Sequence, residues 1–246
     1  MRQPRRGTVS AASVEDFRRR VVALDIGAPL SIRVNARARR LLLRVDAASR
    51  GVELVLPYGV PAEHGLRFLA AQRGWIAARL DALPPPVPFA EGAIVPVLGV
   101  PHRICRESDP AAPPVAIGDG EIRVRGQPAH LGRRVRDHLA QLAAREFSCR
   151  ARAFAARIGK KVTRVTVRDT KSRWGSCSAT GCLSFSWRLI LAPEAAVDYV
   201  VAHEVAHLAE MNHGPRFWRV VAGLVSNHPA PRAWLKRHRS QLLSYG

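Results

Sequence analysis

Hydrophobic and polar positions along the first third of the chain change from the spacing of strands to that of a helix. Residues 30–57 contain two alternating, β-branched segments on either side of the sequence DAASRG, which predicts a hairpin or a meander. Hydrophobic residues then recur at helical spacing from Pro61 to Leu83, and proline is tolerated at a first helical position, so a helix is predicted there. The sequence LPPPVP ends it, because consecutive prolines cannot continue a helix.

Short alternating segments and two further helical ones follow. Strands are predicted in AIVPVLGVPHRICRE and in VAIGDGEIRVRG, where GDG forms the turn. An amphipathic helix is predicted for residues 130–158. VTRVTVRD and CLSFSWRLIL are predicted as strands on either side of KSRWGSCSATG, and another helix follows from Pro193.

These elements predict an α+β fold, because small antiparallel strands with flanking helices replace a regular βαβ alternation. Three parts are predicted: a basic, flexible leader over residues 1–28, a β-rich subdomain with one helix and a proline-rich linker over residues 29–128, and a C-terminal domain over residues 129–246. With 246 residues, 47% of them hydrophobic, the chain can bury a sizeable core.

The chain is strongly basic, with 39 Lys and Arg against 19 Asp and Glu and a formal net charge of +20. This charge favours an anionic partner such as nucleic acid or a nucleotide, although an arginine-rich composition can also reflect coding bias. The clusters ARARR, GRRVR and KRHR lack interleaved aromatic residues, so they predict a solvated basic face with at most non-specific nucleic-acid contact.

No apolar run approaches the roughly 20 residues of a membrane span, and the basic N-terminus lacks the uninterrupted apolar stretch of a signal peptide. The four cysteines do not form the pattern of a secreted disulfide framework. We therefore expect no membrane association and a cytoplasmic location.

The sequence HEVAHLAEMNH, beginning at His203, carries the chemistry. His203 and His207 are four residues apart, so on a helix they lie about 40° apart around the axis and can reach one ion. Glu204 lies beside them, where its carboxylate can approach a water on the metal. Two neutral imidazoles and a carboxylate in this pattern predict a zinc site that hydrolyses its substrate.

A catalytic zinc ion needs a third protein ligand, and we expect this to be His213. Asn212 and Gly214 can turn the chain out of the helix and bring His213 back toward the other two imidazoles. The alternatives left open are Glu210, His228 and His238.

The sequence KSRWGSC precedes the histidine motif and contains candidate substrate-binding residues. Arg173 can contact a substrate carbonyl, an oxyanion or a phosphate, and Lys171 can reinforce it, while the alternative is that Arg173 ties down a loop. We expect Cys177 and Cys182 to be structural thiols. Asp198 either orients a ligand histidine or forms an ion pair, and we favour the ion pair.

Taken in order, RDTKSRWGSC, PEAAVDYVVAHEVAHLAEMNHGPRFW and RAWLKRH resemble the YgjP-like metal-dependent hydrolase family, which is related to SprT-like and other zincin metallopeptidases. The resemblance implies a zincin-like catalytic core in residues 129–246. It further implies one Zn²⁺ per chain on His203, His207 and His213, with Glu204 as the general acid and base.

The resemblance and the motif leave three functions open. We expect a metallopeptidase-like zinc hydrolase with a peptide or protein substrate. The first alternative is a nucleoside triphosphate pyrophosphatase acting on UTP at the same metal centre, since an activated water can attack carbon or phosphorus. The second alternative is a nucleic-acid-associated binding module.

Overall fold

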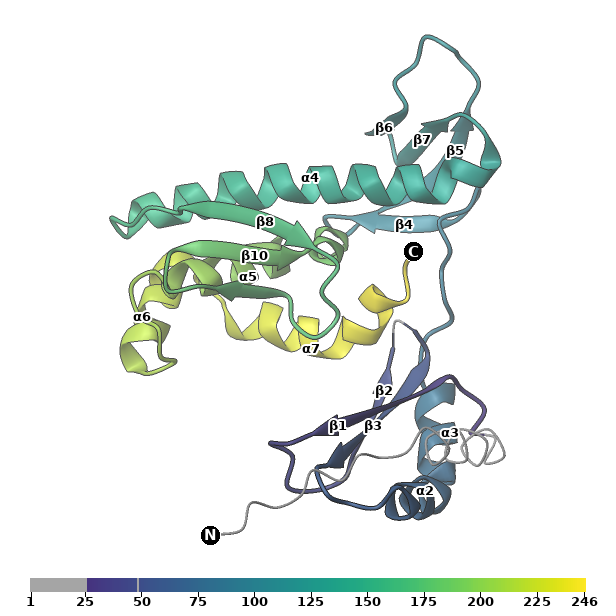
Figure 1. Cartoon of the computed structure of the whole chain (residues 1–246). Helices are drawn as coiled ribbons and strands as arrows, with labels where there is room; N and C mark the ends of the chain where they lie inside the picture. Colours follow the sequence, from purple (N-terminus) through teal and green to yellow (C-terminus); the bar gives the residue numbers. More distant parts are fainter. Residues whose placement is uncertain (1–25, 48) are drawn as a thin grey trace. The chain divides into compact units, whose positions relative to one another are not determined.

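The structure is a computed structural model that describes residues 26–47 and 49–246 (Figure 1). The basic leader predicted for residues 1–28 lies outside the described residues except for its last three. The chain forms two compact units that meet between Pro84 and Pro85. Both units mix helices and strands, which confirms the α+β class.

The first unit is a three-stranded sheet covered by two short helices. Its elements are β1 (Leu30–Asn35), β2 (Leu42–Asp46), β3 (Gly51–Pro57), α2 (Ala62–Ala71) and α3 (Arg73–Asp81). The strand order is β1-β3-β2, so β2 and β3 form the predicted hairpin, and β1 lies parallel to β3. Its core includes Leu54, Leu69 and Ile76, which are fully buried.

The helix predicted as one piece from Pro61 to Leu83 is broken at Gln72. This residue has φ −99° and ψ 7°, and its N–H donates to the carbonyls of both Phe68 and Leu69 at 3.1 Å. The last turn of α2 is therefore tightened, and α3 starts on a new axis. The prediction of a single helix was wrong because hydrophobic spacing continues across the break.

The second unit begins with a four-stranded sheet that packs under a long helix. Its elements are β4 (Ile94–Val97), β5 (Val100–Glu107), β6 (Val115–Gly118), β7 (Glu121–Arg125) and α4 (Pro128–Arg157), with strand order β4-β5-β7-β6. Val95, Ile104 and Ile122 of the sheet share one buried core with Leu139 of α4. The boundary drawn from the sequence between residues 128 and 129 thus falls inside this unit, because the sheet buries its apolar face against the helices that follow it.

A third sheet carries the segment just before the histidine motif. It consists of β8 (Arg164–Arg168), β9 (Gly175–Cys177) and β10 (Cys182–Ser186), in the order β8-β10-β9. β9 was predicted as part of a connection and is instead one of the two edge strands of this sheet. The strand predicted through Leu191 ends at Ser186, and Trp187–Leu191 form a 3₁₀-helix. These five residues are all buried, so the hydrophobic run has no periodicity that separates a strand from a helix.

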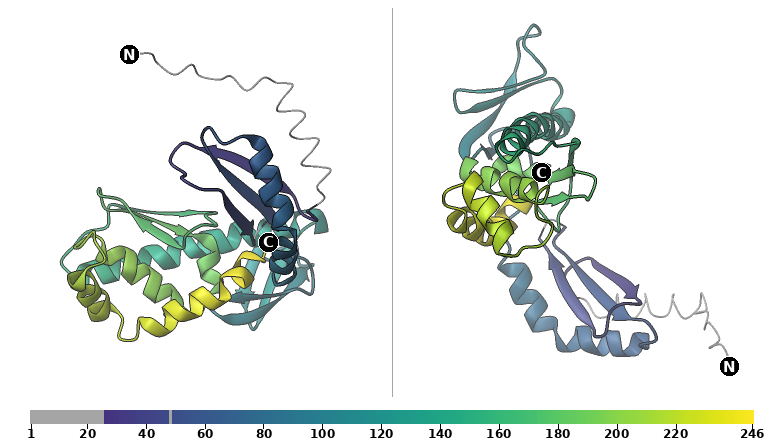
Figure 2. Two further views of the ribbon diagram at one scale, coloured as in Figure 1. Left: turned by 90° about the horizontal axis from the view of Figure 1, so that it is seen from below. Right: turned by 90° about the vertical axis from the view of Figure 1, so that its left-hand side faces the viewer.

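The last three helices are α5 (Glu194–Ala206), α6 (Pro215–Leu224) and α7 (Pro229–Leu243). α5 lies between α4 and α7 and also contacts β9, an arrangement that the views in Figures 1 and 2 show from three sides. The β4–β5 turn packs on the start of α5: Gly99 has φ +82°, and a Cβ there would lie 2.8 Å from the Cα of Pro193. Within the described residues, no helix has both the length and the apolar character required to cross a membrane.

Candidate metal centre and active site

Three histidines converge where α5 ends. His203 lies in the last turn of α5, His207 is its C-terminal cap, and His213 lies on the connection to α6. One imidazole nitrogen from each residue lies within 4.8 Å of the others, and the Nε2 atoms of His203 and His213 are 3.0 Å apart. The described residues therefore bring together all three predicted ligands in a group that can hold one metal ion.

The alternative ligands from the sequence have other contacts. The ring of His228 stacks on Trp218, with centroids 5.4 Å apart, and the ring of His238 stacks on Trp234. Glu210 contributes its backbone: its carbonyl oxygen lies 3.1 Å from Nδ1 of His207. If Nδ1 carries the proton and donates it to this carbonyl, Nε2 of His207 is left free to bind a metal.

The donor set suits a metal ion chemically. Burial, followed by the neighbouring His207 and His213, lowers the pKa of His203 to about 4, and burial also lowers the pKa of His207. Both imidazoles are then neutral at pH 7, which is the form that coordinates metals. Nδ1 of His203 is buried and has no hydrogen-bond partner among the described residues. On the Nδ1 side, packing thus takes the place of a hydrogen bond in holding this ring.

Phe217 supplies that packing from the first turn of α6. Its ring is fully buried, and its centroid lies 4.9 Å from that of His203, 4.6 Å from that of His207 and 4.6 Å from that of His213. One aromatic ring therefore contacts all three imidazoles. This role of Phe217 could not be read from the sequence, because an aromatic residue at helical spacing predicts core packing in general.

Glu204 follows His203 on α5 and faces the edge strand β9. Its side chain is 7% exposed, and burial raises its pKa to about 7, against a smaller lowering effect from Arg173. On β9, Gly175 lies directly opposite: a Cβ there would be 2.6 Å from Cγ of Glu204 and 2.7 Å from Oε1. Only a glycine allows the strand to approach the carboxylate so closely.

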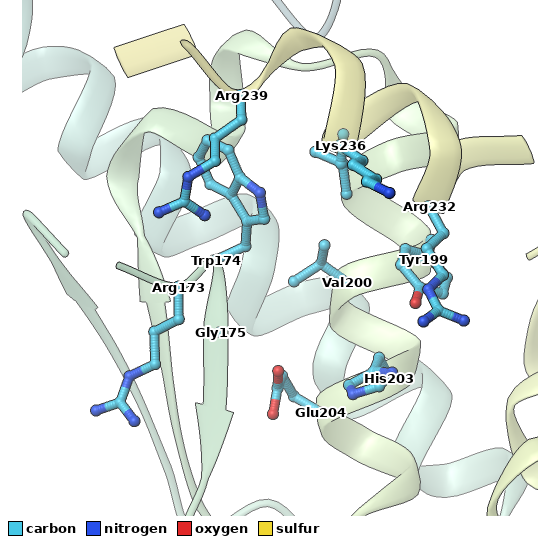
Figure 3. A pocket seen from close by; sticks show the side chains of 11 residues that line it. Arg173, Trp174, Gly175, Tyr199, Val200, His203, Glu204, Arg232, Lys236 and Arg239 are labelled. Carbon is cyan, nitrogen blue, oxygen red and sulfur yellow. The ribbon is translucent and has the colours of Figure 1, made fainter. Parts of the chain in front are cut away.

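A cavity of about 410 Å³ opens beside Glu204 (Figure 3). Its walls come from β9 with the residues before it, from α5 and from α7. The lining residues are Arg173, Trp174, Gly175, Tyr199, Val200, His203, Glu204, Arg232, Leu235, Lys236 and Arg239. The cavity therefore connects one of the three clustered histidines and a buried carboxylate with four basic side chains.

Residues 39–238 match the family described as the YgjP-like, metallopeptidase domain. The chain belongs to the YgjP-like family. The match spans most of the chain and confirms the resemblance seen in its motifs. Membership in this family of metallopeptidase domains makes the protein a metal-dependent hydrolase.

Among solved structures, this YgjP-like chain is similar to the crystal structure of the metallopeptidase zymogen of Pyrococcus abyssi abylysin. The sequence identity is 20% and the TM-score is 0.34, and the similarity covers 39% of this chain and 94% of that chain. No curated protein matches the chain.

The two predicted substrate-binding residues of the YgjP-like chain differ in their positions. Arg173 lines the cavity, whereas Lys171 is not among the lining residues, and its backbone carbonyl accepts a hydrogen bond from Arg239. Asp198 forms an ion pair with Arg150 of α4 at 2.6 Å, as expected. This carboxylate therefore joins α5 to α4.

The two cysteines near the site, Cys177 and Cys182, are free thiols. Burial, followed by the charges of Glu204 and Cys182, raises the pKa of Cys177 to about 11. Cys177 is thus protonated at neutral pH and a poor metal ligand. No metal-binding group within the described part of the YgjP-like chain includes either thiol.

Sequence reasoning missed Gly175 and the three basic residues of α7. A glycine in a predicted connection does not indicate that the chain will closely approach a carboxylate far along the sequence. The sequence does indicate that the α7 residues lie together: Arg232, Lys236 and Arg239 follow each other at intervals of four and three, the spacing of one helix face. Reading KRHR as a cluster, without its helical periodicity, concealed that pattern.

Proposed function

We propose that the protein is a zinc-dependent peptidase. His203, His207 and His213 would hold one zinc ion, and Glu204 would be the general base. The observation that carries this proposal is the convergence of three imidazole nitrogens within 4.8 Å next to a buried carboxylate whose pKa is raised to about 7. Three ligands leave a fourth zinc position for water or substrate, as in catalytic zinc sites.

When bound, zinc supplies a water of lowered pKa and polarises the scissile carbonyl. Glu204 would accept a proton from the attacking water at its carboxylate and give it to the leaving amine. A pKa near the working pH suits both transfers, because the same carboxyl group must accept a proton and then give it up. The absence of a Cβ at Gly175 lets the carboxylate lie against the strand beside the cavity.

The edge strand β9 supports a peptide as the substrate. Among the described residues, β9 pairs only with β10, so the backbone groups on its other side have no strand partner and could pair with an extended chain. Gly175 of β9 lines the cavity beside Glu204. A peptide added to this edge would therefore run past the proposed general base.

The test compares wild-type protein with Glu204→Gln. Both proteins should retain one zinc ion per chain by elemental analysis, and only the wild type should cleave members of a peptide pool analysed by mass spectrometry. Nucleoside triphosphates form a separate arm. Pyrophosphate release that depends on Glu204, without peptide cleavage, would replace the peptidase proposal with the nucleotide alternative. A fully active Glu204→Gln protein would show that Glu204 is not the general base.

A further inference from the structure

The basic side chains of α7 face the proposed catalytic cavity. Arg232, Lys236 and Arg239 all line it, and Arg173 adds a fourth cation from the segment before β9 (Figure 3). The neighbouring Arg237 is exposed and does not line the cavity. The basic character of this wall thus follows one face of α7 and is distinct from the general positive charge of the chain.

The described part of the chain does not pair these four cations with carboxylates. Across residues 26–47 and 49–246, no ion pair joins any of them to a carboxylate. Elsewhere in the same unit, the partly buried Arg150 pairs with Asp198, and the buried Arg188 pairs with Asp169. Glu204 is the one acidic residue in the lining, against four basic side chains.

Two of the cations are also oriented by aromatic rings. The guanidinium of Arg239 lies over Trp174, 5.9 Å from the ring centroid, and that of Arg232 lies over Trp218 at 5.4 Å. Arg239 donates a hydrogen bond to the carbonyl of Lys171 as well. These contacts restrict both side chains, so less conformational freedom is lost when an anion binds.

We propose that this wall selects peptides that carry carboxylates near the scissile bond. Several cations around one cavity, with no protein anion to balance them, favour an anionic occupant. The inference rests on the proposed peptidase function and deepens it, because it names acidic peptides as the substrate class. The carboxylate comes from an Asp or Glu side chain or from the C-terminus of the peptide.

The test uses a set of peptides that share one cleavable core and carry Glu, Gln or Lys on either side of it, each with a free or amidated C-terminus. For the zinc-loaded wild type, kcat/KM should be highest with Glu and lowest with Lys, and the preference should shrink as salt is added. If only the free C-terminus raises kcat/KM, the carboxylate recognised is terminal.

Lys236→Glu is the diagnostic variant, because Lys236 is exposed and its replacement leaves the core intact. It should reduce the preference for Glu over Lys peptides by about tenfold, since an attraction becomes a repulsion. Arg237→Glu is the matched control: it makes the same charge change on the same helix outside the cavity and should preserve the preference. Equal cleavage of Glu and Lys peptides by the wild type, or equal shifts in both variants, would overturn the inference.

Peptide binding to Glu204→Gln, followed by fluorescence polarisation, separates the two proposals. In one outcome, Glu peptides bind more tightly than Lys peptides and Lys236→Glu weakens that binding, while the wild type cleaves neither. This result would support the role of the basic wall and refute the peptidase function. Cleavage by the wild type without any preference for Glu peptides over Lys peptides would support the peptidase function and refute the role of the basic wall.

Discussion

Gly175 of β9 and Glu204 of α5 lie so close together that no Cβ fits between them: it would be 2.6 Å from Cγ of the glutamate. Gly175→Ala should therefore displace the carboxylate from its position in the cavity. Because a shift of about 1 Å in a reacting group can reduce a rate roughly a hundredfold, we expect a loss of that order in kcat. Zinc content, measured by elemental analysis, should be unchanged.

Gly223→Ala is the control for this substitution. Gly223 lies in α6, and a Cβ there would meet no atom within 4 Å, so activity should be preserved. Wild-type kcat in Gly175→Ala would show that Glu204 tolerates the displacement and would contradict the proposed contact.

The raised pKa of Glu204 predicts how the stability of the metal-free protein depends on pH. Burial raises this pKa from 4.5 to about 7, so folding favours the protonated form. The stabilisation is fully present below pH 4.5 and is lost as the pH rises through 7. The free energy of unfolding of Glu204→Gln minus that of wild type should thus increase by about 3 kcal/mol across this window.

Urea unfolding of both proteins in chelator, at a series of pH values from 4 to about 8, measures that difference. Using the difference between two proteins cancels the titration of the histidines, which both share. A difference that stays flat, or that grows toward acid, would show that the folded protein does not favour protonated Glu204.

Removing one imidazole should abolish metal retention. His203→Ala leaves two ligands. Losing only a residue that hydrogen-bonds to a ligand can already lower metal affinity by about a hundredfold, so losing the ligand itself should lower the affinity for zinc by more than that. His228→Ala, which removes a ring stacked on Trp218, should retain the metal. Equal zinc content in the two variants after dialysis would argue against the three-histidine site.

The ion pair between Asp198 and Arg150 should matter for stability and not for catalysis. Asp198→Asn weakens the link between α5 and α4, and we expect a loss of about 1 kcal/mol because both side chains are only partly buried. Asp137→Asn, at an exposed pair with Arg133, should be neutral. A large fall in kcat or in zinc content for Asp198→Asn would instead indicate that Asp198 orients a ligand.

The histidine motif could be predicted from the sequence because its geometry is local. A separation of four on a helix fixes the relative directions of His203 and His207. Asn212 and Gly214 predict the turn that brings His213 back toward these two imidazoles. The family could be recognised for the same reason, since its motifs are short and contiguous.

Features that depend on packing between distant segments could not be predicted in this way. The sheet of β4–β7 was assigned to the N-terminal part because it precedes α4 in sequence, yet its apolar face packs on that helix. β9 has three residues, too few for a period-two pattern. Its proximity to Glu204 arises from the fold and leaves no trace in local sequence.

The contacts of Phe217 link the three-histidine site to the packing of α6. Its ring contacts all three imidazoles, and the residue belongs to α6. An ion on His203 and His213 would hold the connection between α5 and α6 closed and would stabilise the folded protein by its binding free energy. Loss of the ion would free this connection while Phe217 still anchors α6, so protease cleavage between residues 207 and 214 would report metal occupancy without any substrate.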